Sequence, residues 1–105
     1  MAGDITTIAR PYAEAVFAHA QEAKQVDAWG DVLATLSAIT TNADMAEQIG
    51  NPNVPRERLC EAILEILGDA LTAEGKNLVN LLARNNRLST IPEIASLFED
   101  LKTQH

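Results

Sequence analysis

The sequence predicts an all-α fold, a bundle of six helices of which five are long and one is short. Apolar residues recur at helical spacing in every long segment, and no run alternates with the two-residue period of a strand. Only 5 glycines and 4 prolines interrupt the 105 residues, so long unbroken segments remain. Hydrophobic residues make up 47% and charged residues 22%, which is the balance of a globular chain. Because the length is that of one ordinary domain, we predict a single helical domain over 1–105.

The first helix is expected over about residues 5–23 and runs through Pro11. The apolar spacing continues across this proline without a shift of phase, which favours an early start over a helix that begins at Pro11. The apolar positions do not stay on one stripe. Ile5, Ile8, Ala9, Tyr12, Val16 and Ala20 form one face; Ala13, Phe17 and Ala20 form a second, which Ala15 widens. One such face is enough to attach a helix to its own domain.

The second helix is expected to follow Asp27, which is a favourable N-cap residue. Its inward stripe consists of Trp29, Val32, Leu33, Leu36 and Ile39. A short third helix is predicted from about Asp44 to Ile49, ending at Gly50. The segment "GNPNVP" then breaks the chain with two residue–proline steps, and we interpret it as a tight loop.

The fourth helix is predicted to begin near Pro55 and to end at Gly68. Its inward positions are Leu59, Ile63, Ile66 and Leu67, and its solvated positions are Arg56, Glu57, Arg58, Glu61 and Glu65. The fifth helix is expected to start after Thr72 as N-cap and to reach about Asn86. Two apolar stripes share it, one of Leu78, Leu81 and Leu82 and one of Val79 and Ala83.

The sixth helix has a capping-box pair at its start, Thr90 with Glu93, and Pro92 in its first turn. Its apolar stripe is the most regular in the chain and consists of Ile91, Ile94, Ala95, Phe98 and Leu101. Short loops join all six helices, as a helical bundle requires.

Charge and composition exclude several classes of function. With 15 acidic and 8 basic side chains the net charge is −7, which repels nucleic acids and anionic membrane surfaces. No basic patch gathers the few lysines and arginines along the sequence. No apolar run approaches the roughly 20 residues of a membrane span, and no secretory signal opens the chain. We therefore expect a cytosolic protein with no direct membrane insertion and no nucleic-acid partner.

A search for chemistry finds no catalytic constellation. The two histidines are His19 and the terminal His105, and Cys60 as the single cysteine is expected to be a small buried thiol. Glu61 and Glu65 lack the further ligands of a metal site, and no glycine-rich phosphate loop is present. We predict no enzyme activity, no cofactor and no metal, and hence a binding or structural module.

The informative feature is an excess of apolar surface on the first and fifth helices. Such a helix is either central in its bundle or buries a face against another molecule. Periodicity alone favours neither interpretation, and both can hold, one for each face. The second interpretation predicts a groove between the two helices that accepts an amphipathic helix.

Three blocks of sequence resemble the delta subunit family of bacterial F-type ATP synthase, the counterpart of mitochondrial OSCP. They are "ARPYAEAVF", Trp29 and "GKNLVNLLARNNRLSTIPEIASLF", in collinear order over essentially the whole chain. The resemblance implies a six-helix N-terminal domain followed by a C-terminal domain that contacts the b subunits of the peripheral stalk. Since the chain stops at 105, we expect an isolated N-terminal domain without that second domain.

The resemblance also implies a partner and a site. The N-terminal domain of the family binds the N-terminal amphipathic helix of an alpha subunit in a groove of the first and fifth helices. The site residues mapped here are Tyr12 and Ala15 on one wall and Leu78, Val79, Leu81 and Leu82 on the other. The implied role is that of a stator on the cytoplasmic side of the inner (plasma) membrane. It holds the catalytic head still while rotation drives ATP synthesis.

Two rival interpretations remain. In the first, the spare apolar face makes a homodimer, and the chain is a self-associating helical domain of unrelated function. In the second, the chain is a small enzyme or thiol protein that uses Cys60 or His19.

Overall fold

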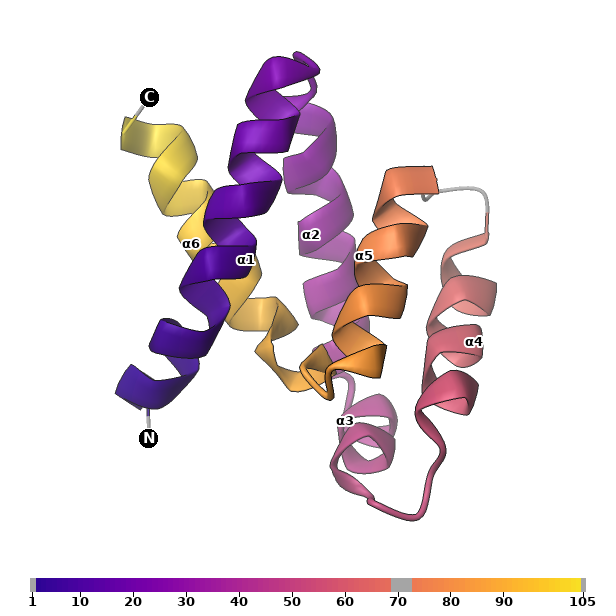
Figure 1. Ribbon diagram of the computed structural model, residues 1–105. Helices are drawn as coiled ribbons and strands as arrows, with labels where there is room; N and C mark the ends of the chain where they lie inside the picture. The colour runs from indigo at the N-terminus through magenta and orange to yellow at the C-terminus, as the bar shows by residue number, and fades with distance from the viewer. Residues whose placement is uncertain (1, 69–72, 105) are drawn as a thin grey trace. The chain divides into compact units, whose positions relative to one another are not determined.

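The computed structural model describes residues 2–68 and 73–104, with side chains from residue 5 onward. Six α-helices and one 3-10 turn account for most of these residues (Figure 1). They are α1 (Ala2–Glu22), α2 (Val26–Thr41), α3 (Ala43–Gly50), α4 (Arg56–Leu67), α5 (Ala73–Arg84), η2 (Leu88–Thr90) and α6 (Ile91–Gln104). No strand occurs within these described ranges, so the predicted all-α class with one short helix is confirmed.

The chain divides into two compact units. The first contains α1, α2 as far as Ala38, and α6 from Thr90 onward. The second spans Ile39–Ser89 and contains α3, α4 and α5. A single domain over 1–105 stays a prediction.

In the first unit α1 packs along α6, and α2 contacts both of them. The rings of Phe17 and Phe98 meet edge to face, with centroids 5.4 Å apart. His19 packs in the same way on Trp29 of α2, at 5.9 Å. The buried apolar side chains of this unit are Ala9, Ala13, Val16, Phe17, Ala20, Trp29, Leu33, Leu36, Ile91, Ile94, Leu97 and Phe98. Alanines form much of the buried side of α1, and small residues allow close approach of a neighbouring helix.

An ion pair joins α6 to α2 at the surface. Lys102 Nζ lies 3.1 Å from Asp27 Oδ1, and this hydrogen bond raises the pKa of Lys102. Both side chains are open to water, so the pair contributes little to stability. Apolar packing therefore holds this unit together.

In the second unit α4 packs against α5, and the ends of α3 and α4 have recognisable caps. Asn42 caps α3, because its Oδ1 accepts hydrogen bonds from the backbone N–H groups of Asp44 and Met45 at 3.0 and 3.3 Å. Gly68 ends α4, as predicted, with a φ of +54° that favours glycine. The buried apolar side chains of this unit are Met45, Ile49, Leu59, Cys60, Ile63, Leu67, Leu78, Val79, Leu82, Ala83 and Leu88.

Several helix bounds differ from the prediction. α1 starts at Ala2 and keeps Pro11 inside it, which confirms the early start. α2 starts at Val26, so Asp27 lies in its first turn and is not the N-cap. α5 ends at Arg84 because Asn86 takes a φ of +59°. The N–H of Arg87 then bonds the Leu82 carbonyl at 2.7 Å, which is a Schellman closure.

Two further predictions have different outcomes. Ile66 was expected to face inward and is 60% exposed, so that assignment is wrong. The spacing from Ile63 to Ile66 places both on neighbouring rows of α4, but only the row of Ile63 is covered. Thr72, the predicted N-cap of the fifth helix, lies outside the described residues.

Gly30→Ala is expected to stabilise the protein by about 0.5–1 kcal/mol, because alanine has the higher helix propensity. Gly30 lies inside α2, and an added Cβ would meet Glu99 Oε2 at 3.1 Å and Phe98 Cε1 at 3.7 Å. The Glu99 carboxylate is the end of an exposed, flexible side chain and can move aside. Urea unfolding followed by circular dichroism measures the change.

Gly68→Ala is the matched control for Gly30→Ala. Its space is open, but its φ of +54° makes any L side chain strained. We expect this variant to lower the free energy of unfolding by about 1 kcal/mol. If Gly30→Ala lowered the free energy of unfolding, the Glu99 side chain would not be able to move away from the added Cβ.

Candidate partner-binding site

An exposed apolar stripe runs along α1. Ile5 is 43% exposed, Ile8 is 36% exposed, Tyr12 is half-buried and Ala15 is exposed. Their spacing of three, four and three residues places them in one row on the helix. The buried residues Ala9, Ala13, Val16, Phe17 and Ala20 form another row, roughly a quarter turn away. The predicted presence of two apolar faces on this helix is confirmed.

The division between these two faces differs from the prediction. Ile5, Ile8 and Tyr12 were grouped with Ala9 and Val16. In the structure Ile5 and Ile8 are exposed and Tyr12 is half-buried, whereas Ala9 and Val16 are buried. Adjacent rows of a helix overlap in spacing, so periodicity alone does not separate them. We call the row of Ile5, Ile8, Tyr12 and Ala15 the α1 stripe.

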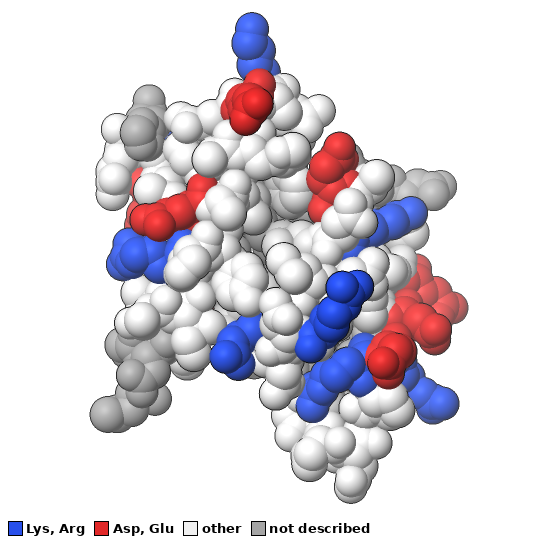
Figure 2. Space-filling model, viewed as in Figure 1, with Lys and Arg blue, Asp and Glu red and all other residues white. Residues whose placement is uncertain are grey.

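The α1 stripe carries no charged residue. The charged side chains Arg10 and Glu14 lie on a different side of the helix by their spacing. Figure 2 shows that much of the surface over α1 in this view is neither acidic nor basic. The stripe is therefore suited to apolar contact and not to an ionic one.

The predicted residues on α5 fall into two classes. Leu78, Val79 and Leu82 are buried in the core of the described chain, whereas Leu81 is 43% exposed. The exposed residues Asn77 and Asn85 stand one turn before and one turn after Leu81. Of the four α5 residues predicted for partner binding, only Leu81 has substantial exposed surface. Periodicity had not decided which of these residues faces the core and which faces a partner.

The structure places the six predicted site residues on two helices that belong to different units. Tyr12 and Ala15 are neighbours on α1 in the first unit. Leu78, Val79, Leu81 and Leu82 follow one another on α5 in the second. Partner binding by these residues, and a groove between the two helices, stay predictions.

Sequence reasoning did not assign Ile5 and Ile8 to the site, although they extend the row of Tyr12 and Ala15 by two turns. The signal that could have found them is their register. Spacings of three, four and three residues connect them to the two residues that were chosen.

Cys60 and His19 are the two residues that the enzymatic interpretation would use. Cys60 is buried, and its Sγ donates to Asn80 Oδ1 at 2.8 Å. Burial raises the pKa of the Cys60 thiol, and the Glu61 charge raises it further, so the nucleophilic thiolate is scarce at neutral pH. His19 is exposed, and its ring meets that of Trp29 edge to face. Within residues 5–68 and 73–104, no group of three His, Cys, Asp or Glu side chains could hold a metal ion.

The described helices were expected to lie outside a bilayer, since no apolar run in the sequence approaches the length of a span. None of them combines the length and the apolar character needed to cross a bilayer.

Comparisons with known proteins converge on one family. The family model described as "ATP synthase delta (OSCP) subunit" matches residues 8–105. "ATP synthase subunit delta" of Alkalilimnicola ehrlichii is 46% identical over 100 residues, which cover 94% of this chain and 56% of that protein. The protein of the same name from Nitrosospira multiformis is 42% identical over 99 residues, with the same two coverages. The chain thus spans about half the length of the curated relatives it matches.

Proposed function

The chain belongs to the ATP synthase delta (OSCP) family, and from this membership we propose that it binds the N-terminal amphipathic helix of an ATP synthase alpha subunit. In this role it is a non-catalytic stator component that helps to hold the catalytic head against rotation. The observation that carries the proposal is the α1 stripe, a row of exposed apolar side chains without a charge.

Burial of apolar surface supplies the affinity in this proposal. At about 25 cal/mol per Å², a few hundred Å² is worth several kcal/mol before the costs of association. Tyr12 offers a large anchor with a polar tip, and Ala15 lets a partner backbone come close. Leu81 of α5 offers a second apolar contact, between two asparagines that can fix the register of a partner helix.

A mechanical role makes no demand on chemistry. A joint that resists torque needs slow dissociation, and slow dissociation follows from complementary packing. The proposal includes a peripheral place at the cytoplasmic side of the inner membrane. It also includes contact with the b subunits through a C-terminal domain of the kind the longer family members possess.

A titration with the alpha-subunit N-terminal peptide, followed by amide chemical shifts, tests the proposal. We expect the largest shifts at Ile5, Ile8, Tyr12 and Ala15, with further shifts around Leu81. A peptide of the same composition but scrambled order is the control, because it lacks an apolar face at helical spacing. Shifts confined to α3 or to the outer side of α4, or equal shifts with both peptides, would contradict the site.

Self-association is the second candidate function, since the α1 stripe could equally cover a second copy of itself. Sedimentation of the protein without peptide separates the two. A monomer that binds the alpha peptide excludes the homodimer, whereas a dimer that dissociates only on dilution favours it.

A further inference from the structure

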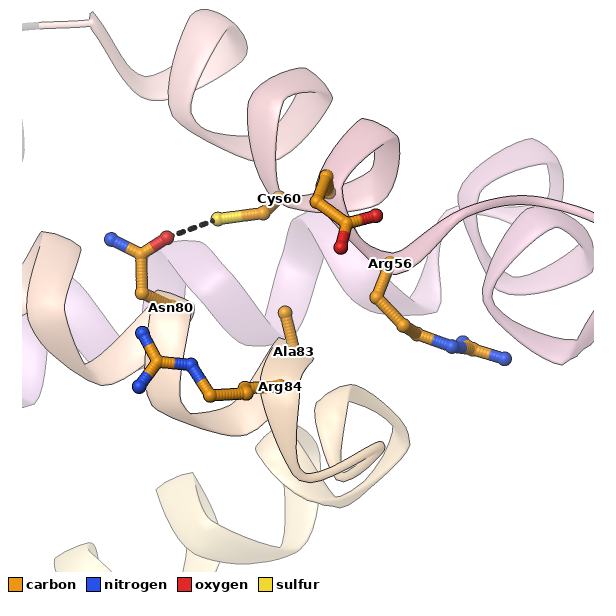
Figure 3. A pocket seen from close by; sticks show the side chains of 6 residues that line it. Arg56, Cys60, Asn80, Ala83 and Arg84 are labelled. Carbon is orange, nitrogen blue, oxygen red and sulfur yellow. Dashed lines mark hydrogen bonds between the residues drawn. The ribbon is translucent and has the colours of Figure 1, made fainter.

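A small notch lies between α4 and α5, entirely within the second unit. Its volume is about 140 Å³, below the roughly 300–1,000 Å³ of pockets that hold drug-sized ligands. Its lining residues are Arg56, Glu57, Cys60, Asn80, Ala83 and Arg84 (Figure 3). The notch can therefore admit a side chain but not a nucleotide or an organic cofactor.

Two hydrogen-bond donors of α5, the side chains of Asn80 and Arg84, line this notch and donate to no residue that the structure describes. Asn80 uses its Oδ1 to accept from Cys60 Sγ at 2.8 Å, so its Nδ2 remains as a donor. Arg84 follows one turn later and makes no hydrogen bond or ion pair with any residue that the structure describes. Figure 3 shows the two side chains on the same side of α5. Together they offer an amide N–H and a guanidinium fork to one acceptor.

The positive charge at the notch is not neutralised from within. Arg56 donates from Nη1 to the Ile49 carbonyl at 3.3 Å, a contact with a neutral group, and extends away from Arg84 in Figure 3. Glu57 lies at the rim, but among the described side chains it forms no ion pair with either arginine. The notch thus carries two cations and one anion on a chain whose net charge is −7.

The basic side chains of the chain are concentrated in this unit. Five of the 8 lie in residues 39–89, namely Arg56, Arg58, Lys76, Arg84 and Arg87. Figure 2 shows several basic side chains over α4 and α5, with acidic side chains next to them. Folding brings Arg56 and Arg84, which lie far apart in the sequence, to the lining of one notch beside Glu57.

We propose that this notch binds a side-chain carboxylate of an acidic segment in a partner protein. The carboxylate accepts from the guanidinium of Arg84 and the amide of Asn80, a pair of donors that matches its two oxygens. Glu57 repels a second negative charge at the rim, so one carboxylate is favoured over a doubly charged phosphate. The site consists of residues that the proposed function does not use, since the α1 stripe is in the first unit and the notch in the second.

The test is a titration with acetyl-tetraglutamate amide, observed at the side-chain N–H signals of Asn80 and Arg84. We expect both signals to shift, and the matched tetraglutamine peptide to shift neither. Arg84→Gln is expected to weaken tetraglutamate binding about fivefold or more, and Arg84→Lys to retain part of it because the charge remains without the fork. Since Arg84 is exposed, circular dichroism should show an unchanged fold.

Arg58→Gln is the control, because Arg58 is an exposed arginine on α4 that does not line the notch. It removes the same charge from the same unit and should change affinity less than about twofold. If Arg84→Gln and Arg58→Gln weakened tetraglutamate binding equally, the binding would be general electrostatic attraction, and the proposal would be overturned. Inorganic phosphate that binds as tightly as tetraglutamate at equal ionic strength would overturn the acidic-peptide assignment, as would silent Asn80 and Arg84 signals.

Discussion

Ala15→Asp and Leu81→Asp are each expected to weaken binding of the alpha-subunit N-terminal peptide by about a hundredfold or more. Each variant places a carboxylate against the apolar face of the partner helix, where it loses water without gaining a donor. Such burial costs roughly 2–4 kcal/mol at an interface, and about 1.4 kcal/mol corresponds to a factor of ten in the dissociation constant. Isothermal titration calorimetry measures the affinity.

Both positions are exposed in the chain itself, so the two substitutions should leave the fold intact. Helicity by circular dichroism is expected to be unchanged. Ala18→Asp is the control on α1, because Ala18 is an exposed alanine on the same helix but outside the α1 stripe. It should bind the peptide about as well as the unaltered protein.

The two aspartate variants also distinguish the contribution of α1 to peptide binding from that of α5. If Ala15→Asp weakens binding and Leu81→Asp does not, the partner helix rests on α1 alone. If neither variant changes the affinity, the α1 stripe and Leu81 are not the binding site, and the proposed mode of binding fails.

Phe98→Ala is expected to have the largest effect on stability, a loss of about 3–5 kcal/mol in the free energy of unfolding. Phe98 is fully buried in α6 and meets Phe17 of α1 edge to face at 5.4 Å. Its removal leaves a cavity where α1, α2 and α6 meet, since Phe98 also lies next to Gly30 of α2. Because the free energy of unfolding of a whole domain is only about 5–15 kcal/mol, this single substitution would remove a large part of it.

Urea unfolding followed by circular dichroism checks this loss. Ile66→Ala is the control, since it also truncates a large apolar side chain but at a position that is 60% exposed. Its effect should stay within about 1 kcal/mol. If Phe98→Ala lowered the free energy of unfolding by no more than about 1 kcal/mol, as expected for Ile66→Ala, the Phe17–Phe98 contact would not be a main element of the core.

The helices themselves could be predicted because each relies on local signals. The α6 segment shows this most clearly, since Ile91, Ile94 and Phe98 were assigned to one inward stripe and all three are buried. Glycine at position 68 also ends α4 where it was expected, because its left-handed backbone disfavours any other residue. The end of α5 was missed because a left-handed Asn86 closes the helix two residues early, and asparagine signals this less clearly than glycine.

The candidate site could be predicted only in part, because periodicity shows which residues share a row but not which row is covered. Ile66 on α4 and Leu78 on α5 both belong to apolar stripes, yet the first is open to water and the second is buried. Burial depends on which neighbouring helix lies against the row, and that is a property of the tertiary fold. For the same reason the sequence could name Leu78, Leu81 and Leu82 together but could not identify Leu81 as the exposed one.

The contact between His19 and Trp29 gives the chain a built-in optical reporter. Trp29 is the only tryptophan, and it is buried in the first unit against the histidine ring. Its fluorescence therefore follows the loss of α1–α2 contact, whereas the far-ultraviolet dichroism follows helices in both units. A single cooperative domain requires the two signals to change at the same denaturant concentration, because all-or-none unfolding gives coincident transitions.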